Sequence, residues 1–372
     1  MDVLMNDTDY MRIALDLAAK GMGTVSPNPM VGAVIVKEGE IIGTGWHRRA
    51  GETHAERNAL ADCSRSPEGS TMYVTLEPCC HYGKQPPCTD AIINAGIHRV
   101  VVGSSDPNPL VSGKGIDILR SSGIQVTENV LKDECDRLNE IFFHYITGGT
   151  PFVIMKYAMT MDGKIAAYTG LSQWITGEEA RSHVQLQRHR CRGIMVGTGT
   201  VLADDPLLTC RLPGAESPLR IICDTSLRTP LSSRLVRTAG DVPTVIATCL
   251  DDERFHKPYE KAGCRILVLP SENGHIDLRR LIKVLGSEGI DSILLEGGGT
   301  LNWAALNSGI VNKVQAYIAP KLFGGRDAKT PVEGQGVLSP AEGFKLKNST
   351  ITKLGSDFLI ESEVEEDVHR DS

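Results

Sequence analysis

The 372-residue sequence lacks any apolar run of the roughly 18 residues that a membrane-spanning helix requires, so we expect no integral membrane protein. The first residues also lack the basic-then-apolar order of a secretory signal, which favours a cytoplasmic location. Cysteine is sparse, with ten residues in the chain, which argues against a disulfide scaffold and leaves the local cluster around Cys79 to explain. Excess positive charge is missing as well. The net charge of −7 favours a small-molecule substrate over a nucleic acid, and a homo-oligomer is compatible with the sequence.

The length of the chain exceeds what one hydrophobic core usually serves, so we expect two domains. Glycines and a proline at 148–151 interrupt the pattern and predict domains over 1–147 and 148–360. Residues 361–372 carry six acidic side chains and are expected to form a disordered tail. Within both domains apolar strands alternate with helices, which predicts an α/β fold with functional residues at the carboxyl ends of strands. Residues 30–47 add a predicted hairpin.

A group of metal-type ligands lies in the first domain. His54 and Glu56 occupy a predicted helix start, and Cys79 and Cys88 follow in two "PC" sequences. One imidazole and two thiolates form a tetrahedral zinc set whose fourth position is open for water. Glu56 is then the candidate catalytic residue, which takes a proton from that water and passes it to a leaving amine. The order His-x-Glu, Pro-Cys and a further Cys is typical of zinc-dependent base deaminases.

Two other interpretations of these residues need no catalysis. Thr53 and Glu56 have the spacing of a capping box, which would leave the histidine incidental. Alternatively, Cys80 and His81 could complete a closed structural zinc site with the two cysteines, an arrangement that gives Glu56 no role.

The stretches "SPNPMVGAVIV", "GWHRRAGETHAE" and "TLEPCCHYGKQPPCTDAI" resemble the cytidine-deaminase-like, three-layer domain of the RibD family, the bifunctional deaminase-reductases of riboflavin biosynthesis. Eight residues separate Cys79 from Cys88, a spacing similar to that of this family and wider than in nucleic-acid deaminases. The resemblance implies that zinc is bound and that the amino group of 2,5-diamino-6-ribosylamino-4(3H)-pyrimidinone 5′-phosphate is replaced by oxygen. It also implies substrate contacts at Asn28, His47, Lys84, Asp106 and Asn108. Turn formation by the asparagines and Asp106, and solvation of His47 and Lys84, remain alternatives.

Two apolar strands of the second domain run into glycine-rich loops, "GTGT" at 197–200 and "GGGT" at 297–300. Small residues and a helix start let main-chain N–H groups approach a phosphate, although such turns also occur for structural reasons alone. Neither loop has the G-x-G-x-x-G pattern of a dinucleotide fold.

Five further stretches, "KYAMTMDGKIA", "SQWIT", "VGTGTVLADDPLLTCR", "CDTSLRTP" and "EGGGTLN", resemble the reductase domain of the same family, which is similar to dihydrofolate reductase in fold. The resemblance implies that NADPH is bound by Ala158, Trp174, Thr200, Asp204, Thr225, Gly298, Gly299, Thr300, Leu301 and Asn302. It implies that the substrate is bound by Ser172, Arg188, Leu208, Arg211 and Glu296, the two arginines suiting a ribose phosphate. A core position for Trp174 and Leu208, a solvated helix face for Arg188 and a turn cap for Asp204 stay open.

The sequence therefore favours an enzyme that deaminates a pyrimidine nucleotide and then reduces its ribosyl side chain to ribityl with NADPH. An RNA-editing deaminase is disfavoured by the acidic balance and by the cysteine spacing. A non-catalytic zinc- and nucleotide-binding regulator is the third hypothesis, and it predicts no turnover at any zinc loading.

Overall fold

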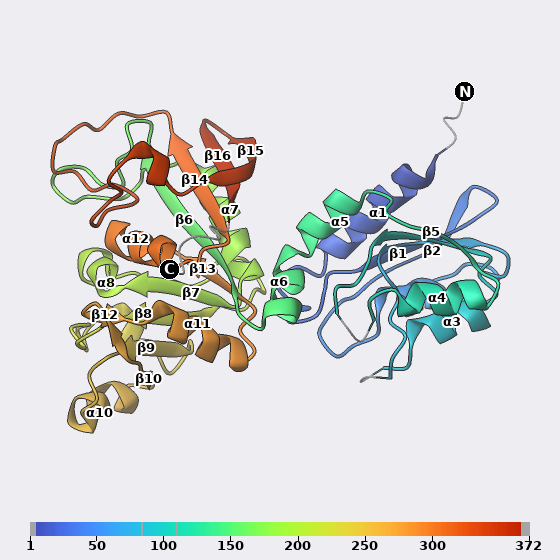
Figure 1. The fold of residues 1–372 in the computed structure, drawn as a ribbon, viewed down its shortest axis with the longest axis horizontal. Coiled ribbons are helices and arrows are strands. Elements are labelled where there is room, and N and C mark those ends of the chain that lie inside the picture. Colours follow the sequence, from blue (N-terminus) through green and yellow to red (C-terminus); the bar gives the residue numbers. More distant parts are fainter. Residues whose placement is uncertain (1–4, 83–84, 109–110, 366–372) are drawn as a thin grey trace. The chain divides into compact units, whose positions relative to one another are not determined.

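The computed structural model describes residues 5–82, 85–108 and 111–365 (Figure 1). The chain divides into two compact units, Met1–Gly149 and Thr150–Ser372. Across the described ranges, no helix has the length and apolar character needed to cross a membrane.

The first unit is built around a five-stranded sheet of order β2-β1-β3-β4-β5. Strand β1 is antiparallel to both β2 and β3, whereas β3, β4 and β5 are parallel. The predicted hairpin is confirmed as β1 and β2, joined through Glu38 and Gly39, whose φ angles of 54° and 81° suit a tight primed turn. The elements are α1 (Asp7–Ala19), β1 (Gly32–Lys37), β2 (Glu40–Trp46), α2 (Ala55–Ala61), β3 (Thr71–Leu76), α3 (Cys88–Asn94), β4 (Arg99–Ser104), α4 (Lys114–Ser121), β5 (Gln125–Thr127), α5 (Lys132–Leu138) and α6 (Glu140–Gly148).

Helices cover both faces of this sheet because successive strand residues point to opposite sides. Ala33 and Ile35 of β1 pack in the apolar cluster that includes α2, α3 and α4. Val34 and Val36 pack on the opposite face, where α1 and α5 contribute Met11 and neighbouring residues (Figure 1). The expected three-layer arrangement is thus confirmed.

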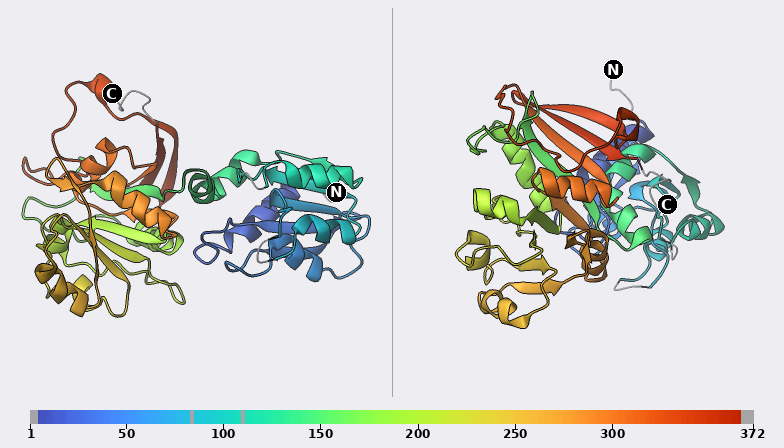
Figure 2. Two further views of the ribbon diagram at one scale, coloured as in Figure 1. Left: turned by 60° about the horizontal axis from the view of Figure 1, so that its bottom comes forward. Right: turned by 60° about the vertical axis from the view of Figure 1, so that its left-hand side comes forward.

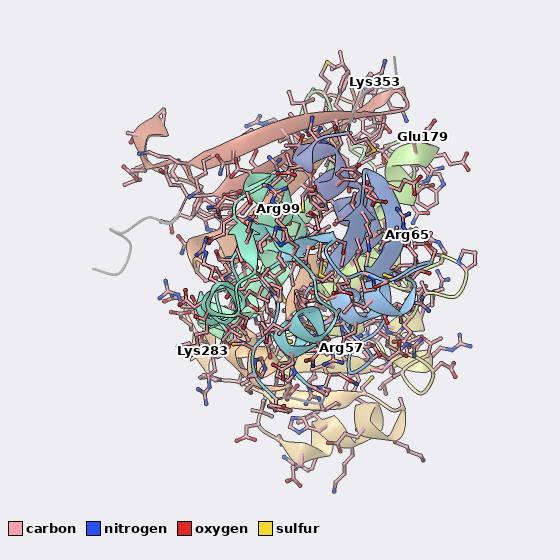
Figure 3. The ribbon with its side chains drawn as sticks, turned by 90° about the vertical axis from the view of Figure 1, so that its right-hand side faces the viewer. Arg57, Arg65, Arg99, Glu179, Lys283 and Lys353 are labelled. Atoms are coloured by element: carbon pink, nitrogen blue, oxygen red, sulfur yellow. The ribbon has the colours of Figure 1, made fainter. Side chains whose placement is uncertain are left out.

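An ion pair fixes α1 to the sheet. Arg99, labelled in Figure 3, lies at the start of β4. It donates from Nη1 and Nη2 to the two carboxylate oxygens of Asp7 at 3.0 and 2.6 Å. The hydroxyl of Tyr73 donates to the same carboxylate at 2.9 Å. These hydrogen bonds lower the pKa of Asp7, with Arg99 the largest cause.

The second unit contains a nine-stranded sheet of order β10-β9-β8-β7-β13-β6-β14-β16-β15. Its first seven strands are parallel, and they are the apolar strands that the sequence predicts to alternate with helices in this domain. The elements are β6 (Phe152–Thr160), α7 (Glu178–Arg190), β7 (Gly193–Gly197), α8 (Thr198–Asp204), β8 (Leu219–Cys223), α9 (Arg234–Arg237), β9 (Thr244–Thr248), α10 (Glu253–Lys261), β10 (Arg265–Val268), β11 (Ser271–Glu272), β12 (His275–Ile276), α11 (Leu278–Ser287), β13 (Ser292–Leu295), α12 (Gly299–Asn307), β14 (Lys313–Ala319), η1 (Pro340–Glu342), β15 (Leu346–Leu354) and β16 (Asp357–Val364).

Two apolar layers enclose the parallel part of this sheet. One face packs against α11 and α12 through residues such as Met195, Leu281 and Leu295. On the other face, Ile194 and neighbouring strand residues pack with α9 and α10. Helix α7 packs against Tyr317 of β14 and Leu359 of β16.

The sheet ends in an antiparallel hairpin, β15 and β16, which the sequence did not predict (Figure 2). Strand β16 runs to Val364 and pairs with β14, so residues 361–364 belong to the sheet and not to the expected disordered tail. The reason is specific pairing: the carboxylate of Glu361 accepts a hydrogen bond from the Gln315 amide at 2.9 Å. Residues 366–372 of that tail lie outside the described residues.

Candidate functional sites

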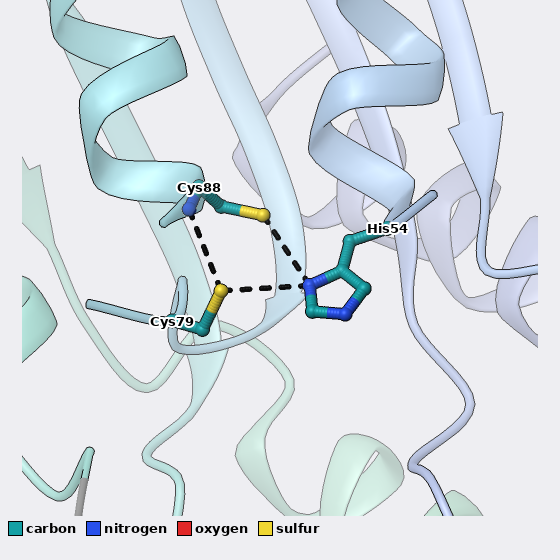
Figure 4. Close-up of side chains that lie close together, drawn as sticks. All are labelled: His54, Cys79 and Cys88. Carbon is teal, nitrogen blue, oxygen red and sulfur yellow. Dashed lines mark hydrogen bonds between the residues drawn. The ribbon is translucent and has the colours of Figure 1, made fainter. Parts of the chain in front are cut away.

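The first unit brings His54, Cys79 and Cys88 together from three elements (Figure 4). His54 is the N-cap residue of α2, Cys79 follows β3, and Cys88 is the first residue of α3. Their potential ligand atoms lie within 4.8 Å of one another, with His54 Nδ1 3.5 Å from Cys79 Sγ and 3.4 Å from Cys88 Sγ. One nitrogen and two sulfurs at this separation fit a Zn²⁺ ion.

The Cys79 thiol is prepared for ligation by its neighbours. Hydrogen bonds from the Cys88 thiol, then from the His54 ring and the Cys88 N–H group, lower the pKa of Cys79 to about 4 although burial opposes them. The main chain closes the same loop, because the N–H groups of Cys88 and Thr89 donate to the Cys79 carbonyl at 3.0 and 3.2 Å. A thiolate is the form that binds a metal.

Glu56 lies in the first turn of α2 and is buried, with 3% of its surface exposed. The capping-box alternative is wrong, since His54 and not Thr53 is the N-cap residue and no side chain caps this helix. Burial, followed by the nearby Cys79, raises the pKa of Glu56 to about 7, and its carboxyl group hydrogen-bonds the Cys88 thiol. A buried carboxyl group in contact with a ligand cysteine is suited to moving a proton.

The closed structural site receives no support from the geometry. Among the described residues, the one group with metal-ligand spacing contains His54, Cys79 and Cys88, and it includes neither Cys80 nor His81. Three protein ligands leave a fourth position, as in catalytic zinc sites.

Two of the predicted substrate residues lie beside the metal ligands. The rings of His47 and His54 are 5.3 Å apart in an edge-on arrangement. His47 Nδ1 donates to the Thr53 carbonyl at 3.2 Å, which leaves Nε2 to accept from the Asn28 amide at 3.1 Å. His47 is 2% exposed, so the solvated alternative is wrong, and burial lowers its pKa and favours the neutral ring.

Asp106 and Asn108 follow β4, and the sequence missed the residue that anchors their loop. Asp106 accepts the Asn108 N–H at 2.8 Å in a turn, and burial raises its pKa to about 6. Glu77, buried at the end of β3, accepts four main-chain N–H groups, from Asp106 (3.3 Å), Gly113 (3.0 Å), Gly115 (3.0 Å) and Ile116 (3.3 Å). The position of Glu77 directly before the "PCC" sequence is the signal that could have identified this residue. Lys84 lies outside the described residues.

In the second unit, the predicted NADPH residues other than Trp174 lie at or just after the carboxyl ends of four adjacent strands, β6, β13, β7 and β8. Parallel strands bring these ends to one edge of the sheet. Ala158 lies in β6, Thr200 and Asp204 in α8 after β7, Thr225 after β8, and Gly298, Gly299, Thr300, Leu301 and Asn302 at the start of α12 after β13.

Two glycines of these turns leave main chain open to a ligand, whereas Gly297 and Gly299 pack closely against other parts of the chain. A Cβ atom at Gly199 would meet nothing within 4 Å, and one at Gly298 would meet only Thr200 Oγ1, at 3.6 Å. Bare backbone before a helix fits the phosphates of a dinucleotide cofactor. Asn302 instead points inward: it is fully buried and donates to the Pro331 carbonyl at 2.8 Å.

A buried charge cluster joins three elements of the second unit. Arg188 of α7 donates from Nε and Nη2 to the two oxygens of Glu296 at 2.7 and 3.0 Å, and Lys156 of β6 donates to Glu296 at 3.3 Å. Burial alone raises the pKa of Glu296, but the two cations outweigh it and lower the pKa to about 2. The solvated-face alternative for Arg188 is therefore wrong. Lys156 was missed, although a lysine inside an apolar strand signals a partner or a function.

The other predicted substrate residues are more dispersed. Ser172 Oγ donates to Asp204 at 2.9 Å, so this expected pair of substrate and cofactor residues is in contact. Trp174 is 60% exposed, which excludes the core alternative, and the Arg181 guanidinium lies 4.9 Å from its ring centroid. Leu208 is buried in the apolar cluster, as the core alternative holds, whereas the Arg211 residue is exposed.

Comparison with known proteins supports two enzyme domains. Residues 4–104 match the cytidine and deoxycytidylate deaminase zinc-binding region, and residues 151–360 match the RibD C-terminal domain. The chain is 53% identical over 357 residues to the riboflavin biosynthesis protein RibD of Actinobacillus pleuropneumoniae, covering 96% of this chain and 95% of that protein.

Two solved structures share the whole fold. Acinetobacter baumannii RibD (form 1) superposes with a TM-score of 0.84 at 33% identity, covering 97% of this chain and 99% of that one. The diaminohydroxyphosphoribosylaminopyrimidine deaminase/5-amino-6-(5-phosphoribosylamino)uracil reductase of Thermotoga maritima superposes with a TM-score of 0.83 at 36% identity, covering 96% and 98%. The donor set of the first unit fits zinc, and the open glycine turns of the second fit NADPH. The chain therefore belongs to the RibD family and is a bifunctional enzyme of riboflavin biosynthesis, with a zinc-dependent deaminase domain followed by an NADPH-dependent reductase domain.

Proposed function

We propose that the chain catalyses two consecutive reactions on one pyrimidine nucleotide. The first replaces the ring amino group of 2,5-diamino-6-ribosylamino-4(3H)-pyrimidinone 5′-phosphate by oxygen, consuming water and releasing ammonia. The second uses NADPH and a proton to convert the ribosyl side chain of the product, 5-amino-6-(5-phosphoribosylamino)uracil, to ribityl. The Thermotoga maritima relative carries both activities in its name. We place both reactions in the cytoplasm, on a small molecule, without nucleic acid or membrane, and a homo-oligomer is compatible with this function.

The observation that carries the first reaction is the buried Glu56 carboxyl group beside a three-ligand set. Zinc bound to His54, Cys79 and Cys88 supplies a Lewis acid that acidifies water. Glu56 accepts a proton from the water and delivers it to the departing amino group, since its raised pKa lets it act in both directions near neutral pH. We assign His47 to the pyrimidine by resemblance: Nδ1 stays with the Thr53 carbonyl, and Nε2 would exchange the Asn28 amide for the substrate ring.

The remaining deaminase contacts follow from position in the loops. We assign Asp106 and Asn108 to the substrate because Glu77 holds their loop against the segment that leads to Cys79. Lys84 completes the proposed set by resemblance alone.

For the reduction, NADPH supplies the hydride and the protein must hold the nicotinamide against the ribosyl carbon. We assign the cofactor to Ala158, Trp174, Thr200, Asp204, Thr225 and residues 298–302, which lie at one edge of the parallel strands apart from Trp174 on its loop. Substrate contacts are assigned to Ser172, Arg188, Leu208, Arg211 and Glu296. Nε and Nη2 of Arg188 already donate to Glu296 and Nη1 donates to the Thr209 carbonyl, so the exposed Arg211 is the better partner for the ribose phosphate.

One assay tests both halves. The zinc-loaded chain is incubated with the diaminopyrimidine nucleotide, first without and then with NADPH, and products are identified by mass. We expect an oxygen-for-NH exchange without NADPH and a further gain of two hydrogens with it. An unchanged diaminopyrimidine at full zinc loading would support the regulator hypothesis, and a deaminated but unreduced product would overturn the assignment of the second domain.

A further inference from the structure

Arg220 is a fully buried arginine in the parallel part of the reductase sheet. It lies in β8, between β9 and β7, and 0% of its surface is exposed. Within the described part of the chain, its hydrogen-bond partners include no carboxylate. The guanidinium donates instead to six neutral oxygens: Thr244 Oγ1 (2.9 Å), Thr238 Oγ1 (2.8 Å), and the carbonyls of Leu207 (3.2 Å), Leu235 (3.1 Å), Thr238 (3.0 Å) and Val242 (2.9 Å).

Burying a charge without a hydrogen-bonded counter-charge is costly unless dipoles replace water at every donor. Here the acceptors come from three separate segments: the 205–211 segment, the end of α9 with the turn after it, and the first residue of β9. The guanidinium keeps its hydrogen bonds only if each of these carbonyl groups stays in position. Arg220 therefore holds the three segments in one fixed arrangement.

The 205–211 segment is the part of this arrangement that reaches the proposed substrate. Its backbone is tied down at several points: Asp205 Oδ1 accepts the Arg234 N–H at 2.7 Å, the Thr209 carbonyl accepts from Arg188 at 3.0 Å, and the Arg211 N–H donates to Gln185 at 2.8 Å. Asp205 and Leu208 have positive φ angles of 38° and 52°. Such a conformation persists in non-glycine residues when the surroundings over-determine it.

Of the oxygens that accept from Arg220, the Leu207 carbonyl is the one directly before Leu208 in the chain. The Leu208 side chain is buried in the cluster that contains Leu235 and Val236 of α9, so its main chain is the part left to face a ligand. Arg220 binds the carbonyl before it and the carbonyl of Leu235 with the same planar group. The position of the Leu208 main chain thus depends on Arg220.

We propose that Arg220 is a positioning residue for the reductase: it fixes the 205–211 segment to the end of α9 and so places the Leu208 main chain and Arg211 for the phosphorylated ribose of the substrate. The role rests on the proposed function of the second domain. Arg220 touches neither substrate nor cofactor. It acts through the Leu207 carbonyl, whereas the cofactor residues 298–302 lie on a different segment, at the start of α12.

The test uses Arg220→Lys in the full chain, because an ammonium group keeps the charge but cannot span all three segments. We expect the KM for the deaminated nucleotide to rise about tenfold, as a displaced binding segment would cause. The Kd for NADPH should change much less than the KM, because Asp204 is the assigned cofactor residue that borders the 205–211 segment, and the deaminase activity of the same chain should be unchanged. Arg265→Lys is the matched control: it makes the same replacement at an arginine of β10 that is 48% exposed and paired with Glu288, so its KM should match that of the wild type.

Equal losses of NADPH binding and substrate binding in Arg220→Lys would show a general structural role and overturn the proposal, as would an unchanged KM. If the lysine variant does not fold, Asp205→Gly loosens the same segment from the other side, since glycine tolerates the positive φ but cannot accept from Arg234. We expect a raised KM there too, and a wild-type KM would refute the role. Absence of reduction by the wild-type chain would instead overturn the proposed function of the domain.

Discussion

Removing the charge of Glu296 should destabilise the second unit, because two buried cations depend on it. In Glu296→Gln, Arg188 and Lys156 lose their carboxylate while their side chains remain only 12% and 14% exposed. Leaving one member of a buried ion pair without its partner typically costs about 3–5 kcal/mol. The pKa leads to a similar figure: a fall from 4.5 to about 2 corresponds to about 3 kcal/mol at about 1.4 kcal/mol per pH unit.

The effect also has a predictable pH dependence. The folded-state pKa of Glu296 is lowered, so its stabilisation is complete above the ordinary pKa of 4.5 and is lost as the pH falls towards about 2. The wild type and Glu296→Gln should therefore differ by about 3 kcal/mol at pH 7 and converge in acid. Urea unfolding, followed by hydrogen exchange in peptides from β6 and β13, measures the second unit separately from the first.

Glu288→Gln provides the matched control. Glu288 forms a two-point pair with Arg265 at 2.7 Å for both contacts, but the arginine and glutamate side chains are 48% and 34% exposed. Exposed pairs contribute about 0–1 kcal/mol, so this variant should be nearly as stable as the wild type. A Glu296→Gln protein no less stable than Glu288→Gln, or a difference that persists unchanged at low pH, would refute the electrostatic reasoning.

Three further predictions concern the two activities. Glu56→Gln should keep zinc, and its deamination rate should fall by about 10² to 10⁴-fold, since an amide cannot transfer a proton. Metal analysis and initial rates measure the two properties. A near-normal deamination rate would remove Glu56 from the mechanism. Cys88→Ser should lose zinc while Cys80→Ser keeps it, as metal content per chain will show; equal losses would restore the closed structural site. A fragment beginning at residue 148 should reduce the deaminated nucleotide with NADPH and without zinc; a folded, NADPH-binding fragment that reduces nothing would show that the site requires another part of the protein.

The sequence predicted the strands whose apolar residues face packed helices and missed the hairpin at the end of the chain. The seven parallel strands of the second unit are short, apolar and bounded by turn residues, so their pattern is strong. Strand β15, "LKNSTITKL", is exposed along nearly its whole length and has no buried face to impose a period. The acidic composition of residues 361–364 places this part of β16 in the expected tail. Composition does not reveal that Glu361 pairs with Gln315.

The functional residues likewise fall into those that the sequence could identify and those that it could not. His54, Glu56, Cys79 and Cys88 could be proposed from spacing because the chemistry itself fixes which residue types are needed. Contacts made between distant segments could not: the sequence gives no indication that Lys156 would reach Glu296, 140 positions later. For Leu208, the residue type alone indicated a place in the core. The role that we propose for its main chain depends on the fold and could not be predicted from the sequence.

Glu77 has a consequence for attempts to redesign the deaminase. One carboxylate accepts N–H groups on both sides of the loop after β4 and at the start of α4, and the same residue directly precedes the Pro78–Cys79 segment. A loop grafted from another deaminase to change the accepted base would have to present its N–H groups at the same four points. Without that match, the graft would leave a buried carboxylate unsatisfied two residues from a metal ligand. Under the proposed substrate contacts, changes to the loop and retention of the metal are therefore coupled in this domain, and a library that varies the loop should vary position 77 with it.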